Sequence, residues 1–200
     1  IIIGHGLHFS LRSYVNKALT AYQATIDIPP DTVDQLIEFI RLRFENDTVS
    51  SGVKTEVVAA ATVVNFDDVV DCKSRIQSLD GISGREQFSV LAGSFKRINN
   101  IIKDNTDTLI DEALLGDGAE RQLYQTLVQV QTDVEPLIND SRYNEALEMM
   151  LRMKEQVDLF FYEVMVMTDD LSIRQNRLNM LTALGQLVLK VGDISNMHQE

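Results

Sequence analysis

Apolar residues recur every three or four positions along most of the chain, which is the spacing of α-helices rather than strands. One stripe, in the second predicted helix, consists of Val33, Leu36, Ile37, Ile40 and Phe44. The pattern predicts helices over residues 10–24, 31–46, 54–63, 66–78, 85–103, 119–138, 143–164 and 171–194. We therefore expect an all-α helical bundle.

Glycine, proline and short polar residues mark the joints between these helices. The clearest internal joint is Leu79-Asp80-Gly81-Ile82-Ser83-Gly84. It predicts an N-terminal helical section over 1–80 that packs on a bundle over 84–200, unless the two form one continuous domain. Residues 1–3 and 63–65 have strand-like composition, but no hairpin signal accompanies them.

The overall charge of the chain is acidic, but its distribution is uneven. Eighteen basic and 30 acidic residues give a net charge of −12, which argues against a nucleic-acid partner because phosphates repel acidic surfaces. Residues 73–103, however, contain six basic and two acidic residues, whereas residues 104–170 contain four basic and sixteen acidic ones. The first region is therefore a candidate nucleic-acid site. The second is either a solvated exterior or a docking face for a basic partner.

Several classes of site find no support in the sequence. The single cysteine, Cys72, excludes an internal disulfide and a cysteine-based zinc site. No apolar run approaches the roughly 18 residues of a membrane span, and no glycine-rich phosphate loop or nucleophile elbow is present. Because the chain begins at Ile1 rather than methionine, we expect a fragment of a longer protein. The unpaired Cys72 and the lack of a targeting segment favour a cytoplasmic setting, and the lack of catalytic motifs predicts no catalytic site in this fragment.

The predicted helix over 85–103 has an apolar face and a basic face. The basic face carries Lys96, Asn100 and Lys103, with Arg97 beside them and Gly93 among them. Lysines neutralise phosphates, arginine stacks or binds acceptors with two donors, and asparagine reads base edges. Gly93 leaves room for a close backbone approach. The alternative interpretation is an ordinary solvated helix face.

Other polar candidates have simpler structural explanations. His5, His8 and His198 lack the helical spacing and the neighbouring carboxylates of a metal site, so we expect no bound metal and surface histidines instead. Asp169 and Asp170 precede the last predicted helix, where acidic residues cap free N–H groups.

The last third of the chain contains methionines and arginines that allow two interpretations. Six methionines could line a binding groove or belong to the core, and their helical spacing favours the core. They are Met149, Met150, Met153, Met165, Met167 and Met180. Arg177 lies near the buried side of the last helix, which favours a structural ion pair with Asp158 or Glu163 over contact with RNA. Arg174 is expected to face outward.

Four segments resemble the bacterial glycyl-tRNA synthetase β-subunit family. Residues 157–167 (VDLFFYEVMVM) resemble its D-x-F-F-x-x-V-M-V-M signature, and residues 174–178 (RQNRL) resemble its R-x-N-R-L motif. Residues 95–103 and 191–195 are similar to its K-R-V-x-N-I-L helix and its terminal V-A-D-I-S. The resemblance covers most of the chain and is strongest from Lys96 onward. Gly93-Ser94 and Gly192 depart from it, since the family tends to have alanine at Gly93 and Gly192.

The resemblance implies an anticodon-binding helical bundle, related to that of arginyl-tRNA synthetases, at the C-terminus of a long β subunit. In this family the β subunit holds glycine tRNA, the α subunit carries the ATP-, magnesium- and glycine-binding site, and two α and two β subunits form the ligase. The resemblance thus implies no cofactor in this segment, and no membrane or DNA partner. The alternative is a non-catalytic interaction module whose acidic face docks a partner subunit.

The resemblance makes Lys96, Arg97, Asn100, Lys103 and Arg174 the candidate tRNA-binding residues. Glycine anticodons share two cytosines, whose amino groups donate hydrogen bonds to carboxylates, amides or carbonyls. Asn99 and Asn100 are the nearest acceptors in sequence to the basic face, and the sequence does not choose between them.

Overall fold

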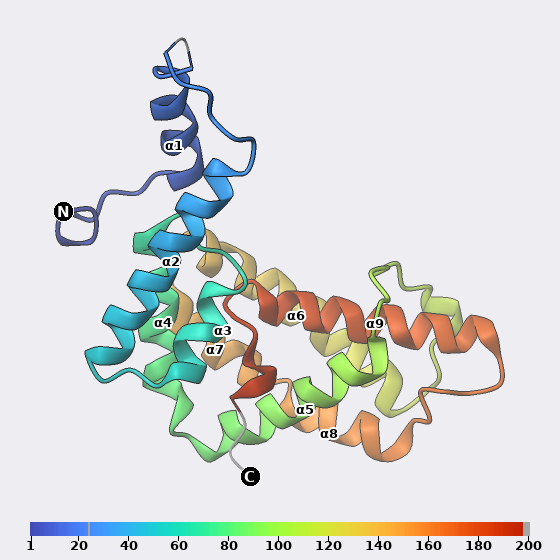
Figure 1. The fold of residues 1–200 in the computed structure, drawn as a ribbon. Coiled ribbons are helices and arrows are strands. Elements are labelled where there is room, and N and C mark those ends of the chain that lie inside the picture. Colours follow the sequence, from blue (N-terminus) through green and yellow to red (C-terminus); the bar gives the residue numbers. More distant parts are fainter. Residues whose placement is uncertain (24, 198–200) are drawn as a thin grey trace.

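The structure is a computed structural model and describes residues 1–23 and 25–197 (Figure 1). Within these ranges every regular element is helical and none is a strand, so the all-α prediction is confirmed. The α-helices are α1 (Leu11–Thr20), α2 (Thr32–Ser50), α3 (Thr55–Thr62), α4 (Val69–Ser83), α5 (Glu86–Ile102), α6 (Ala119–Asn139), α7 (Tyr143–Leu151), α8 (Lys154–Glu163) and α9 (Leu171–Leu189). Short 3-10 helices cover Ile3–His5, Glu112–Leu114 and Ile194–Asn196.

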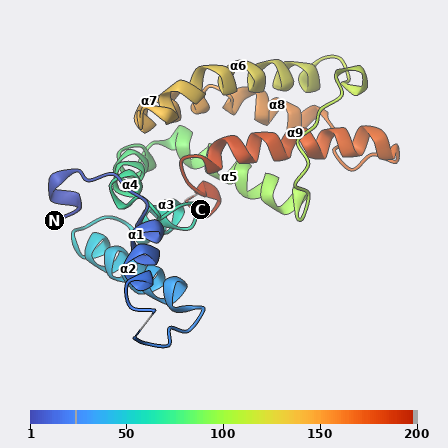
Figure 2. The same cartoon turned by 90° about the horizontal axis from the view of Figure 1, so that it is seen from above.

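Helices α5 to α9 form a bundle, and the earlier helices extend from one end of it. In the bundle α5 packs against α8 and α9, while α6 packs against α7, α8 and α9. Helices α3 and α4 adjoin this bundle, and α1 and α2 form a hairpin that projects away from it in both views (Figures 1 and 2). None of the described helices is both long enough and apolar enough to cross a membrane.

Several helix boundaries differ from the sequence prediction; the last helix, for example, ends at Leu189 rather than at residue 194. The single helix expected over 143–164 is interrupted at Arg152 and Met153, which separate α7 from α8. The joint expected over 79–84 is helical up to Ser83, because the buried side of α4 continues through Leu79 and Ile82. Ala24, the predicted end of the first helix, lies outside the described residues. The division of the chain into sections 1–80 and 84–200 stays a prediction.

A buried arginine joins α3, α4 and α7. The Arg75 side chain, 2% exposed, donates to the Asp71 carboxylate at 3.0 Å, to the Ala61 carbonyl at 2.8 Å and to the Asn65 carbonyl. The hydroxyl of Tyr143 on α7 donates to the same Asp71 carboxylate. Burial, helped by this hydrogen bond, raises the pKa of Tyr143 to about 12. The N-terminal helices and the bundle therefore share one polar network.

The segment after α9 returns to α3 and α4 through a close approach at Gly192. The Asp193 N–H donates to the Ala60 carbonyl at 2.8 Å. A β-carbon on Gly192 would lie 3.0 Å from that carbonyl oxygen and 2.8 Å from the Leu79 side chain. Glycine at this position, where the resembled family has alanine, is thus explained by packing.

We predict that Gly192→Ala lowers the free energy of unfolding by about 1–3 kcal/mol, because the Ala60 carbonyl is backbone and cannot move aside easily. Chemical denaturation measures the change. The control is Gly81→Ala on the exposed side of α4, where nothing lies within 4 Å of the new β-carbon. That variant is expected to gain about 0.5–1 kcal/mol. A stable Gly192→Ala protein would contradict the close approach.

An ion pair between α9 and the start of α6 positions the loop that follows α8. Arg177 binds Glu120 through Nε–Oε1 at 3.1 Å and Nη2–Oε2 at 2.7 Å, with side chains 16% and 1% exposed. Its remaining nitrogen donates to the Met165 carbonyl at 3.0 Å. The expected ion pair is present, but the predicted partners, Asp158 and Glu163, were wrong. Asp158 instead faces α5 and pairs with Lys154 on its own helix at 2.8 Å.

We predict that Arg177→Met lowers the free energy of unfolding by about 3–5 kcal/mol, because it leaves the buried Glu120 carboxylate without its cation. The double variant Arg177→Met/Glu120→Leu should recover a large part of that loss, since apolar side chains replace buried ion pairs at little cost. Urea denaturation of both variants provides the comparison. A double variant no more stable than Arg177→Met would show that the unpaired charge is not the cause.

Candidate nucleic-acid interface

The two faces predicted for residues 85–103 are both present on α5. Its buried side consists of Phe88, Leu91, Ala92, Phe95 and Ile98. Lys96, Arg97 and Asn100 are exposed on the outer side, within about one turn of each other. The structure therefore brings together the basic and amide side chains that were proposed for RNA contact.

Arg97 is held in place by an aromatic ring of α8. Its guanidinium carbon lies 4.1 Å from the centroid of the half-buried Phe161 ring, which is cation–π geometry. Phe161 in turn meets the buried Phe160 ring edge-on at 5.7 Å. The stacking that the sequence suggested for Arg97 is thus made within the protein, so the guanidinium is pre-oriented while remaining exposed.

Two adjoining grooves lie along the contact between α5 and α8. The first, of about 400 Å³, is lined by Val90, Gly93, Ser94, Arg97, Asp158, Phe161 and Tyr162. The second, of about 430 Å³, is lined by Arg97, Ile101 and residues 161–167. Arg97, Phe161 and Tyr162 border both grooves. Each groove has room for a planar group beside a cation and aromatic rings.

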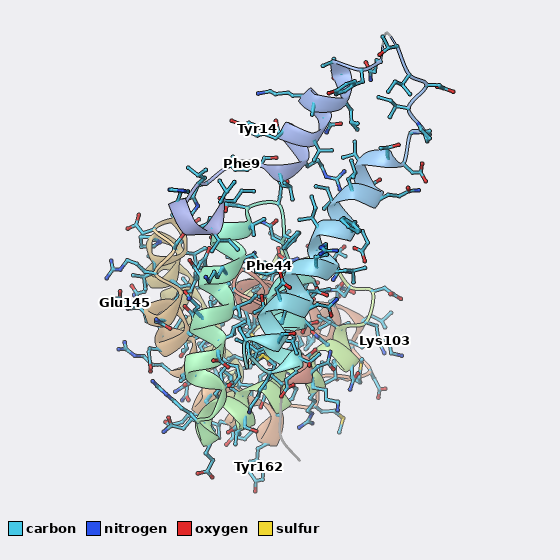
Figure 3. The ribbon with its side chains drawn as sticks, turned by 60° about the vertical axis from the view of Figure 1, so that its left-hand side comes forward. Phe9, Tyr14, Phe44, Lys103, Glu145 and Tyr162 are labelled. Carbon is cyan, nitrogen blue, oxygen red and sulfur yellow. The ribbon has the colours of Figure 1, made fainter. Side chains whose placement is uncertain are left out.

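Tyr162 is the most prominent side chain here and was missed by the sequence prediction. It is 88% exposed and points away from the body of the molecule in Figure 3. The sequence does indicate that Tyr162 is exposed, because helical spacing places it outside the buried face of α8 that contains Val157 and Phe160. A large aromatic side chain exposed beside a cation is typical of surfaces that stack on bases.

The core position expected for the methionines is correct for some of them and wrong for others. Met150, Met153 and Met180 are buried. Met165 and Met167 are exposed, because α8 ends at Glu163 and the following loop no longer obeys helical spacing. These two methionines form part of the wall of the second groove.

Asp158 places a carboxylate in the first groove. Its side chain is 42% exposed, and its Oδ2 accepts from the Lys154 ammonium at 2.8 Å. Its Oδ1 accepts a long hydrogen bond, 3.3 Å, from the hydroxyl of Ser94. Gly93, on the α5 side of the groove, has nothing within 4 Å of the position of a β-carbon. The acceptor is therefore oriented, accessible and next to open space.

Two of the five candidate RNA contacts lie apart from these grooves. Lys103 ends α5 with a positive φ of 49° and is well separated from Tyr162 in Figure 3. Arg174 is half-buried near the start of α9, whose first turns extend beyond the end of α5 in Figures 1 and 2. Neither residue lines either groove.

The remaining polar candidates have structural roles or surface positions. Asp170 caps α9 by accepting from the N–H groups of Ser172 and Ile173 at 2.9 and 3.1 Å, so its predicted capping role is confirmed. His5 and His8 are exposed, and His8 contacts Asp68 at 2.9 Å. His198 lies outside the described residues. Over 1–23 and 25–197, no group of three or more His, Cys, Asp or Glu side chains could hold a metal ion.

The chain is similar in sequence to known proteins over almost all of its length. It is 36% identical over 198 residues to the glycine–tRNA ligase beta subunit of Trichlorobacter lovleyi, and 36% identical over 198 residues to that of a Geobacter species. It is 32% identical over 200 residues to the protein of the same name from Desulforapulum autotrophicum. Each match covers 98% of this chain and 29% of the relative. The chain thus spans less than a third of the length of these relatives.

A family match coincides with the part of the structure that holds the grooves. The family described as DALR anticodon binding domain matches residues 92–194. This range contains most of α5, all of α6 to α9, and the groove residues Arg97, Asp158 and Tyr162. Because the match covers more than half of the 200 residues, the chain belongs to the DALR anticodon binding domain family.

Proposed function

We propose that this chain is the anticodon-binding segment of a glycine–tRNA ligase beta subunit, which holds glycine tRNA while an alpha subunit aminoacylates it. The observation that carries the proposal is the exposed basic face of α5, with Lys96 and Arg97 beside the aromatic side chains of α8. Phosphates need cations, and unpaired bases need flat surfaces on which to stack. An anticodon loop presents both to a binding protein.

The acidic surface elsewhere on the chain is compatible with this proposal. Residues 104–170 carry most of the negative charge and repel phosphates, so they direct RNA toward the face of α5 that attracts it. Several exposed carboxylates are also matched by arginines: Arg142 pairs with Glu145 at 2.6 Å, and Arg85 pairs with Glu148. Binding at this face should weaken as salt rises, with a slope that scales with the number of phosphates neutralised.

The proposal assigns binding, and not bond-making, to this segment. Activation of glycine with ATP and magnesium is assigned to the alpha subunit, and the expected assembly contains two alpha and two beta subunits. In this arrangement the segment contributes to the reaction by positioning the tRNA. Such an enzyme acts in the cytoplasm, where tRNA is charged.

We predict that the charge reversal Lys96→Glu/Arg97→Glu weakens binding of glycine tRNA by the 200-residue chain on the order of 10-fold or more, because attraction to phosphates becomes repulsion. The helical circular-dichroism signal should not change, since both side chains are exposed. Filter binding at several salt concentrations provides the affinities. The salt dependence should also become shallower, by about one unit of slope for each phosphate that the variant no longer binds.

The matched control is Lys17→Glu/Arg43→Glu, which makes the same charge change at exposed positions of the projecting α1–α2 hairpin. It should bind glycine tRNA as the unchanged protein does. Equal affinities of the two double variants would refute the site assignment. If the unchanged chain retains a partner protein but no tRNA, the acidic-face docking alternative replaces the proposal.

A further inference from the structure

We propose that the first groove between α5 and α8 holds one cytosine of the anticodon, with Asp158 accepting from its exocyclic amino group and Tyr162 stacking on its ring. This inference rests on the proposed function, because the glycine anticodon supplies the cytosine. It replaces the acceptors expected from sequence, Asn99 and Asn100, neither of which lines the groove.

The carboxylate of Asp158 is oriented to offer one oxygen rather than two. Lys154 binds Oδ2 at 2.8 Å, while the contact of Oδ1 with the Ser94 hydroxyl is long, at 3.3 Å. Oδ1 is therefore the oxygen available to a ligand. A single acceptor suits the one amino group of cytosine, whereas the adjacent N1–H and N2–H donors of guanine need two acceptors.

The side chains around Asp158 supply the donors that the rest of a cytosine edge requires. Cytosine presents its amino donor beside the ring acceptors N3 and O2. The Ser94 hydroxyl lies 3.3 Å from both the Val90 carbonyl and Asp158 Oδ1. Because both contacts are long, the hydroxyl can turn toward such an acceptor. The guanidinium of Arg97 borders the same groove. Uracil reverses this order, placing its O4 acceptor against the carboxylate and its N3–H against the donors.

Gly93 gives the base edge access to this carboxylate. The position of its β-carbon has no atom within 4 Å, and the residue lies on the wall of the groove opposite Asp158. The resembled family tends to have alanine here, so this chain leaves more open space between α5 and α8. A carboxylate in this space repels phosphate, which favours entry of a base rather than of the RNA backbone.

Tyr162 supplies the stacking surface above the groove. Its ring is 88% exposed and stands next to the Arg97–Phe161 pair, which is fixed at 4.1 Å. Because Arg97 and Phe161 already pair with each other, the main side chain that must become ordered when a base binds is Tyr162. The D-x-F-F-x-x-V-M-V-M pattern leaves the position of Tyr162 open. The proposed stacking contact therefore depends on the tyrosine in this chain, and the family pattern does not specify it.

We predict that Asp158→Asn abolishes discrimination between cytosine and uracil at one anticodon position. The probes are the glycine tRNA anticodon stem–loop and two versions in which one of the two shared cytosines is replaced by uridine. The unchanged chain should bind one uridine version roughly 10- to 100-fold more weakly than the cytosine stem–loop. Asp158→Asn should bind these two RNAs within about 2-fold of each other, because its amide can donate to O4 of uracil.

The control is Glu155→Gln, which removes the charge of an exposed carboxylate on α8 that lines neither groove. It should preserve the discrimination. Retained discrimination in Asp158→Asn overturns the inference, and so does equal affinity of the unchanged chain for the cytosine stem–loop and both uridine versions. These outcomes are distinct from failure of the proposed function, in which the unchanged chain does not bind the stem–loop at all.

We also predict that Tyr162→Ala weakens binding of the stem–loop by roughly 5- to 100-fold, the range for removal of one aromatic ring that stacks on a base. Tyr162→Phe should bind as the unchanged chain does, because it keeps the ring. A fluorescent cytosine analogue at the discriminated position should be quenched on binding to the tyrosine and phenylalanine proteins, but not to the alanine variant. Equal affinity and equal quenching in Tyr162→Ala overturn the stacking part of the inference.

Discussion

The buried ion pair between Arg177 and Glu120 is the interaction on which the side of the bundle that carries the candidate interface depends. It joins α9 to the first turn of α6, and the same guanidinium holds the Met165 carbonyl at 3.0 Å. A carboxylate that is 1% exposed has lost its hydration, and only a paired cation and satisfied hydrogen bonds offset that cost. The direction of the loop after α8, and with it the wall of the second groove, therefore follows from this pair.

The candidate interface is made from segments far apart in the sequence. Helix α5 contributes the cations and the open position at Gly93, and α8 contributes Asp158 and the aromatic residues. Each side restricts the other, since Phe161 fixes Arg97 and the Ser94 hydroxyl contacts Asp158. Because these contacts limit the side-chain conformations on both helices, the donors, acceptors and rings of the surface have defined positions.

The ends of the described chain are also tied into one structure. Arg75, Asp71 and Tyr143 link the N-terminal helices to α7, while Gly192 allows the last segment to lie against α3. The bundle that carries the interface is thus supported from outside the residues matched by the family. Damage at Gly192 or Arg75 would act on the candidate interface through stability rather than through direct contact.

The sequence by itself determined the helices, the all-α class and the basic outer face of α5, because helical periodicity fixes which side chains share a face of one helix. Family motifs added the expected role. Only the tertiary structure decided the partner of Arg177, the exposure of Met165 and the position of Asp158 beside Gly93. The physical reason is that these features depend on which helices meet and where a helix ends, and periodicity within one segment carries no information about either.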